Sequence, residues 1–244
     1  MKDELAYPAL HKQFFMMMKH YSADIDKVYR SLKKEFANNR VPVVDLIEAQ
    51  TRDPFKILVT TMLSARTKDR TTSAAAQRLF RVIDTFEDID KISLSMLEKL
   101  IYPVGFYHEK ARNLKKWPKT IQEEFGGTIP ASVEELVKLP GVGRKTANLV
   151  VAIGFNIPAV CVDVHVHRIF NRLGYLVSKT PLETEMLLRK HLPVRYWTTF
   201  NSYFVSFGQH TCFPVNPRCN RCPVYRWCGK VHVETKYGLR RKSH

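Results

Sequence analysis

The tetrapeptide Pro140–Gly143, within the run LPGVG, is the feature that most constrains how this chain folds. Ser132 and Glu135 stand at capping-box spacing and predict a short helix that the proline stops. The two glycines permit positive φ and close backbone approach, and residues 144–153 have the pattern of a second helix. The stretch therefore predicts two helices joined by a tight hairpin, with the first amides of the second helix facing an anion such as phosphate.

Apolar residues recur at helical spacing along most of the chain, and nothing alternates with strand period for long. Its 244 residues, with 45% hydrophobic content, are enough for a sizeable core in one or two domains. We therefore predict an all-α protein with about ten helices.

Several helix boundaries are marked by single residues. Asp53 is an expected N-cap followed by proline, and Thr180 opens a second capping box. A last long helix is expected from about Val194 until Gly208 stops it. Pro118 lies inside a helical pattern, so it is expected to kink or split that helix.

The charge balance points to a polyanionic partner. Lys and Arg number 39 against 23 Asp and Glu, which gives a net charge of +16 and favours nucleic acid. No apolar run approaches the ~20 residues that span a bilayer. The N-terminal stretch mixes charges into its apolar residues, unlike a signal peptide. We expect an intracellular protein without a membrane partner, in the cytoplasm or nucleoid of a prokaryote or in a eukaryotic nucleus.

Two residues beside the hairpin carry the chemical signal. Lys145 falls in the first turn of the second predicted helix, where the positive end of the helix dipole disfavours an ammonium. Asp163 ends the apolar run PAVCV and precedes another helical pattern, so it is an expected N-cap. A lysine and an isolated acid in this setting favour catalysis, although helix-hairpin-helix elements also occur in proteins that only bind nucleic acid.

Four of the five cysteines cluster near the C-terminal end, with six, two and five residues between them: Cys212, Cys219, Cys222 and Cys228. Disulfides are disfavoured in a chain of this size and expected location. Four thiolates satisfy either zinc or an iron-sulfur cluster, and ligand chemistry alone leaves both open. The basic residues Arg218 and Arg221 lie between these cysteines and would place positive charge near phosphate.

The runs LPGVGRKTAN and VDVHVHR resemble the helix-hairpin-helix and aspartate motif of DNA glycosylases related to endonuclease III. The similarity extends from PFKILVTTMLSARTKD through VGFYHEKA to the final cysteines. It implies two helical lobes with a DNA cleft between them. Residues 47–157 would form a six-helix barrel domain, and 1–46 with 158–244 a second domain carrying the cysteines. The cysteine spacing is similar to the family's 4Fe-4S loop, so the resemblance favours that cluster over zinc.

The resemblance also implies a reaction. Lys145 would attack the sugar as a free amine, expel the damaged base, and form a Schiff base that permits β-elimination at the abasic site. Asp163 would help to deprotonate the lysine or stabilise the charge developing on the sugar. The expected enzyme is a bifunctional DNA glycosylase and abasic-site lyase of base excision repair, acting as a monomer on oxidised pyrimidines in duplex DNA.

Further DNA contacts follow from the same resemblance. Arg66 and Phe106 match the positions that enter the duplex when a base is extruded, although Arg66 departs from the glutamine of bacterial endonuclease III. The hairpin contributes Gly141, Val142, Gly143 and Arg144. Carbonyls of Val137, Leu139 and Val142 are implied as ligands of a monovalent cation.

Two alternatives remain open on the sequence. One is a mismatch-directed uracil or thymine glycosylase on the same scaffold, which differs in substrate only. The other is a non-catalytic helix-hairpin-helix binding protein with structural zinc. A panel of lesion duplexes distinguishes the first alternative from the expected enzyme. Turnover on an abasic duplex distinguishes the second, which would show none.

Overall fold

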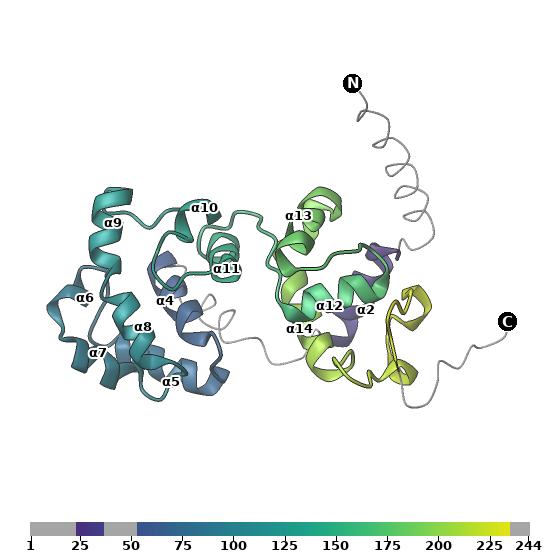
Figure 1. Ribbon diagram of the computed structural model, residues 1–244, viewed down its shortest axis with the longest axis horizontal. Helices are drawn as coiled ribbons and strands as arrows, with labels where there is room; N and C mark the ends of the chain where they lie inside the picture. Colours follow the sequence, from purple (N-terminus) through teal and green to yellow (C-terminus); the bar gives the residue numbers. More distant parts are fainter. Residues whose placement is uncertain (1–22, 37–52, 235–244) are drawn as a thin grey trace, which may run out of the picture. The chain divides into compact units, whose positions relative to one another are not determined.

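The computed structural model describes residues 23–36 and 53–234, and every regular element in these two ranges is a helix (Figure 1). None of these helices is long and apolar enough to cross a membrane. The α-helices are α2 (Ile25–Phe36), α4 (Pro54–Ser64), α5 (Asp69–Leu79), α6 (Asp88–Lys91), α7 (Leu94–Ile101), α8 (Tyr107–Leu114), α9 (Trp117–Phe125), α10 (Val133–Leu136), α11 (Arg144–Gly154), α12 (Val164–Leu173), α13 (Pro181–His191) and α14 (Phe200–His210). The short 3₁₀ helices are η1 (Val194–Tyr196), η2 (Cys219–Arg221) and η3 (Tyr225–Trp227).

The chain divides into two units by its internal contacts. One unit is Arg40–Cys161, which contains α4 to α11, and the other joins Met1–Asn39 to Val162–His244 and contains α2 and α12 to α14. The predicted hairpin and Lys145 fall in the first unit, whereas Asp163 and the four clustered cysteines fall in the second. Each unit has its own packed helices.

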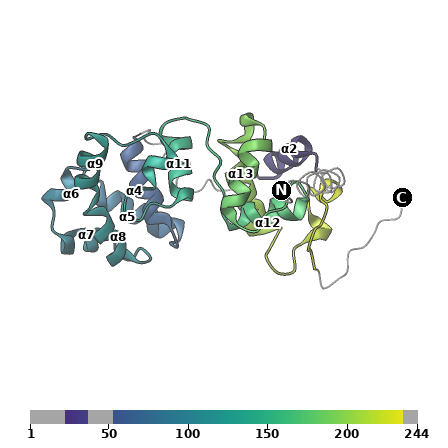
Figure 2. The same cartoon turned by 45° about the horizontal axis from the view of Figure 1, so that its top comes forward.

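The first unit is organised around α4, which packs against α5, α8 and α11. Figure 2 shows α11 beside α4. Residues on every side of α4 are buried, from Phe55 at 5% exposure to Leu63 at 0%, which explains why its sequence is apolar nearly all round. At the end of α11, Gly154 allows a close approach, because a Cβ there would lie 3.2 Å from the Cα of Pro54. This packing anchors α11, the helix that follows the hairpin.

Local capping explains where several helices begin, as the sequence predicts. The Asp53 carboxylate accepts a hydrogen bond from the Phe55 amide at 2.9 Å. The Thr180 hydroxyl accepts from the Glu183 amide at 3.2 Å. Each cap satisfies an amide that has no partner inside its helix, and such a cap contributes about 1 kcal/mol.

Pro118 splits a helical pattern rather than kinking one helix. α8 ends at Leu114 and α9 begins at Trp117, so the proline occupies the first turn of α9, where a missing N–H costs nothing. Gly126, at φ 61°, ends α9 in a left-handed conformation. The conflict between Pro118 and the apolar spacing around it is therefore resolved by a break between two helices.

The second unit is built on α12 and α14, which contact each other, while α2 packs on α14 and α13 on α12. The rings of Phe170 and Phe204 stack with centroids 4.7 Å apart and an interplanar angle of 11°. Both side chains are fully buried. These aromatic contacts join helices that lie far apart in the sequence and fix α12, which begins at Asp163.

The predicted end of the last helix at Gly208 is wrong. α14 runs from Phe200 to His210, and residues 194–196 form the separate 3₁₀ helix η1. A Cβ at Gly208 would lie 2.5 Å from Nδ1 and 2.8 Å from Cβ of His165. The glycine is there to let α12 and α14 approach each other, which is a tertiary reason that sequence spacing does not reveal.

Candidate functional site

The hairpin between α10 and α11 forms as the sequence predicts. The Ser132 hydroxyl accepts from the Glu135 amide at 3.2 Å, and the Val142 amide donates to the Leu139 carbonyl at 3.0 Å. The indole of Trp117, a fully buried residue, donates to the Pro140 carbonyl at 2.9 Å. These bonds hold the hairpin on the body of its unit.

The two hairpin glycines have different roles. Gly141 has φ 80°, and a Cβ on it would lie 2.7 Å from Nδ2 of Asn113. Gly143 has φ −89° and ψ 168°, and nothing lies within 4 Å of its Cβ position. Both glycines permit positive φ, but only Gly141 adopts it, and Gly143 has a conformation that any residue adopts. Gly143 leaves open space in front of the helix instead.

Helix α11 begins at this open space. Gly143 is its N-cap residue and no side chain caps the helix. Lys145 is exposed in the first turn, and half-buried Arg144 lies 3.7 Å from a carboxylate oxygen of Glu134. The Val142 side chain is buried at 6% exposure, so a ligand at the hairpin meets its backbone rather than its side chain.

Asp163 is the N-cap of α12, as the sequence predicts. One oxygen of its carboxylate, Oδ1, accepts from the amides of His165 and Val166, both at 2.9 Å. The residue is 9% exposed. These two bonds fix the carboxylate in one orientation at the helix start.

Arg66 and Phe106, which lie forty positions apart in the sequence, are brought together. Arg66 is exposed with φ 54°, and Phe106 is 58% exposed with φ 59°. The guanidinium carbon lies 5.4 Å from the centroid of the phenyl ring, within the range of a cation–π contact. A Cβ on Gly105 would lie 2.6 Å from the Arg66 carbonyl oxygen, so glycine is needed for the two loops to touch.

Three of the four clustered cysteines lie in or next to the 3₁₀ helices: Cys219 begins η2, Cys222 follows it, and Cys228 follows η3. All five cysteines of the chain are free of disulfides. Burial, together with the other thiols of the cluster, raises the pKa of Cys222 to about 12 and that of Cys228 to about 11. Such a set is stable as thiolates only beside a cation, so its chemistry fits a metal centre. Within the described ranges, however, no three His, Cys, Asp or Glu side chains are arranged to hold a metal ion.

Arg172, on α12, organises the cysteine loop and was not predicted. Its guanidinium donates to the carbonyls of Phe213 at 2.6 Å and Pro214 at 2.7 Å, and to Sγ of Cys212 at 3.4 Å. Its own carbonyl accepts from the amide of Val231 at 3.0 Å. One arginine therefore binds the chain just after the first cysteine of the cluster and just after the last.

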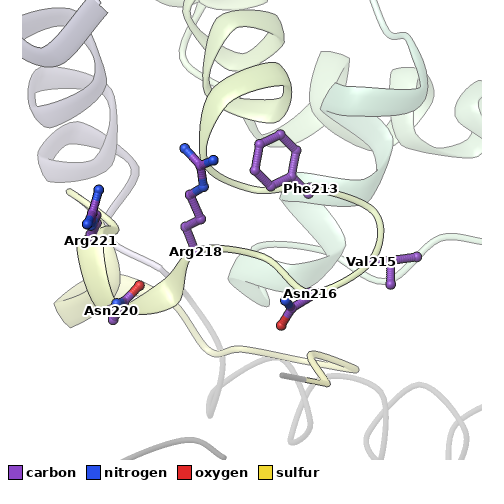
Figure 3. Close-up of a pocket in the computed structure, with 6 residues that line it drawn as sticks. All are labelled: Phe213, Val215, Asn216, Arg218, Asn220 and Arg221. Carbon is purple, nitrogen blue, oxygen red and sulfur yellow. The ribbon is translucent and has the colours of Figure 1, made fainter. Parts of the chain in front are cut away.

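Arg218 and Arg221 line one surface pocket, together with Phe213, Val215, Asn216 and Asn220 (Figure 3). Figure 3 shows the Arg218 side chain directed toward the Phe213 ring, and its guanidinium carbon lies 5.1 Å from the ring centroid. Both arginines are exposed. Two guanidinium groups on one pocket are donors that an anion could bind, and the prediction that these arginines contact phosphate stays a prediction.

The fold and the hairpin define a class of protein. Residues 59–194 match the model of the HhH-GPD superfamily base excision DNA repair proteins, and the chain belongs to this superfamily. Within it, the chain belongs to the endonuclease III family. It is 41% identical over 218 residues to endonuclease III of Thermotoga maritima, and the match covers 87% of this chain and 98% of that protein.

Solved structures agree with this assignment. A non-covalent endonuclease III–DNA complex is similar with a TM-score of 0.73 and 34% identity, over 84% of this chain and 94% of that one. A trapped endonuclease III–DNA covalent intermediate, an estranged-adenine complex, is similar with a TM-score of 0.72 and 32% identity, over 90% and 95%. The family resemblance on the sequence is thereby confirmed.

Proposed function

We propose that this chain removes oxidised pyrimidines from duplex DNA and cleaves the resulting abasic site through Lys145. As a member of its family it is a base excision repair DNA glycosylase with abasic-site lyase activity, and its partner is damaged duplex DNA. A non-catalytic binding protein is therefore set aside. The observation that carries the assignment to Lys145 is its exposed position in the first turn of α11, after a helix start that no side chain caps.

Lys145 acts as the nucleophile in this proposal. Its neutral amine attacks C1′ of the extruded nucleotide, and the bond to the base breaks as the base takes up a proton. Ring opening gives an imine between the amine and the sugar. Loss of a proton from C2′ then breaks the C3′–O bond by β-elimination, and water releases the sugar fragment and returns the amine. Each step needs the lysine side chain to reach DNA, which an exposed residue does.

Asp163 supports this step with its charge. The two hydrogen bonds from backbone amides to Oδ1 help to hold the carboxylate in place. A fixed carboxylate near C1′ accepts the proton that the amine loses, or stabilises the positive charge that develops on the sugar. We propose that it acts on the same nucleotide as Lys145.

The DNA backbone is held by the hairpin and by the basic pocket. The open space at Gly143 lets phosphate approach the first amides of α11, where the helix dipole favours an anion. Carbonyls of Val137, Leu139 and Val142 would hold a monovalent cation there. The exposed guanidinium groups of Arg218 and Arg221 would bind phosphate elsewhere along the duplex.

Arg66 and Phe106 would fill the gap left by the extruded base. Their cation–π contact places one flat cation and one apolar ring side by side on two loops. Arginine can donate to an orphaned base, and its planar charged guanidinium can also stack on it, which sets it apart from the neutral amide of glutamine. This difference bears on which opposite base the enzyme prefers.

The four clustered cysteines would hold one 4Fe-4S cluster, whose role is to stabilise the loop. Their interactions with one another, and the donor bonds that reach Cys212 from Arg172 and Cys228 from the Lys230 amide at 3.4 Å each, support this proposal. N–H donors near cluster sulfurs are typical of such sites. The loop would then present Arg218 and Arg221 on a rigid frame.

The boundaries of the two domains, 47–157 for the six-helix barrel and 1–46 with 158–244 for the cluster domain, are part of the proposal. The two units found from internal contacts, which divide between 39 and 40 and between 161 and 162, support a boundary close to these positions.

Single-turnover base release from a panel of duplexes tests the substrate. The panel contains an oxidised pyrimidine, uracil or thymine opposite guanine, and an undamaged control. We expect release from the oxidised pyrimidine to be at least tenfold faster than from either mismatch. A faster reaction on the mismatches would replace the proposed substrate with the mismatch-directed alternative.

A further inference from the structure

Lys110 is a buried lysine with no part in the proposed chemistry. It lies on α8, is 7% exposed, and donates to the carbonyls of Leu63 at 2.8 Å and Ala65 at 2.6 Å. The Thr67 hydroxyl lies 3.4 Å from the same nitrogen. Lys110 therefore binds the chain on both sides of Arg66.

The same residue is also linked to the other loop. The backbone amide of Lys110 donates to the Phe106 carbonyl at 3.0 Å, as the first turn of α8. Across the two loops, the Gly105 amide donates to the Thr67 hydroxyl at 3.0 Å. Lys110 and Thr67 thus form a small network that joins the backbone next to Arg66 to the backbone next to Phe106.

A charge in this position is costly, and its cost indicates a specific task. Burial lowers the pKa of Lys110 to about 8, and the three oxygens that it meets are uncharged groups. A methionine would fill similar space without desolvating a charge. Only the ammonium can donate hydrogen bonds to the carbonyls at the end of α4, where the helix dipole also favours a cation.

We propose that Lys110 is a positioning residue that holds Arg66 and Phe106 as one wedge, so that both enter the duplex together when a base is extruded. The inference rests on the proposed function, in which these two residues fill the gap. Both residues hold left-handed conformations that non-glycine residues rarely adopt, at φ 54° and 59°. Loss of the ammonium frees the carbonyls beside Arg66 and lets its loop move independently of Phe106.

Lys115 provides a matched control variant. Its ammonium also donates to backbone carbonyls, those of Ile89 at 2.8 Å and Ile92 at 3.0 Å, but it contacts neither Arg66 nor Phe106. Lys110→Met and Lys115→Met each remove one lysine that holds backbone carbonyls. Any difference between them in DNA distortion therefore reports the wedge rather than general loss of stability.

The test uses full-length protein and a duplex with a non-cleavable abasic analogue opposite 2-aminopurine. Fluorescence at saturating protein reports how the base opposite the gap is displaced, and single-turnover base release is measured on an oxidised-pyrimidine duplex. We expect Lys115→Met to match wild type in fluorescence. Lys110→Met should lose most of the fluorescence change that wild type causes. It should also release base about tenfold to a hundredfold more slowly than Lys115→Met.

Equal fluorescence and equal rates for the two variants would overturn the role of Lys110. Should Lys110→Met fail to fold, Thr67→Val removes the hydroxyl that accepts from Gly105 while keeping the shape of the side chain. Thr67→Val should also give a smaller fluorescence change than wild type. A fluorescence change equal to that of wild type would overturn the inference. Failure of wild type and Lys115→Met alike to release any base would instead refute the proposed function.

Discussion

Substitutions of the two hairpin glycines should have opposite effects, because the fold needs Gly141 and the proposed ligand needs Gly143. Gly141→Ala places a Cβ at φ 80°, where a left-handed alanine costs roughly 1–2 kcal/mol. The new methyl group would also lie 2.7 Å from Nδ2 and 3.3 Å from Cβ of Asn113, and the second atom moves only with its backbone. We expect the free energy of unfolding to fall by at least about 2 kcal/mol in total, since overpacking adds about 1 kcal/mol.

Gly143→Ser is the matched variant. Serine adopts φ −89° and ψ 168° without strain, and nothing lies within 4 Å of the Cβ position. Serine is among the best N-cap residues, so its hydroxyl would bind an amide of the first turn of α11 and keep or raise stability. The same hydroxyl and methylene would occupy the place proposed for phosphate. Loss of one charge-assisted hydrogen bond there weakens DNA binding about tenfold.

Two assays separate these effects. Calorimetry should show Gly141→Ala melting about 4–8 °C below wild type, and Gly143→Ser melting at or above it. Titration of an abasic-analogue duplex at fixed salt should show weaker binding for Gly143→Ser. Wild-type affinity for Gly143→Ser would refute the hairpin as a phosphate site, and equal loss of stability in both variants would refute the distinction between the two glycines.

Three further predictions follow from the site. Asp163→Asn keeps an N-cap while removing the charge, so it should fold and bind an abasic duplex but lose single-turnover activity by about 10² to 10⁴; activity within tenfold of wild type would show that the charge is dispensable. Purified protein should be brown with about four irons per chain, and colourless, zinc-rich protein would contradict the proposed cluster. For duplex binding, Arg218→Ala should reduce the magnitude of the slope of log K against log salt by about 0.9. An unchanged slope would show that Arg218 does not contact a DNA phosphate.

Features set by neighbouring residues were predictable from the sequence. The caps at Asp53, Asp163 and Thr180 depend on a side chain and an amide two or three residues later, so a local pattern is sufficient. The hairpin at Gly141 is equally local, because only a few residue types accept its φ. These signals located the helices and the proposed catalytic residues.

Features set by contacts between distant segments were not predictable. Gly208 has the residue type of a helix stop, yet it lies inside α14 because His165 approaches it from α12. The contact between Arg66 and Phe106 joins two loops whose meeting depends on how α4 and α8 pack. The burial of Lys110 could have been predicted from the sequence. It lies four residues before Leu114 on the apolar side of α8, where a solvated lysine is unexpected.

Covalent trapping tests the central claim, that Lys145 is the nucleophile of an enzyme, most directly. Wild type, Lys145→Ala and the nearby surface variant Lys138→Ala are incubated with an abasic-site duplex and borohydride, which reduces an imine to a stable bond. The crosslinked peptide is then identified by mass spectrometry. The proposal predicts full crosslinking for wild type and Lys138→Ala, at a peptide containing Lys145, and none for Lys145→Ala. A full yield of crosslink with Lys145→Ala would place the nucleophile elsewhere and contradict the mechanism.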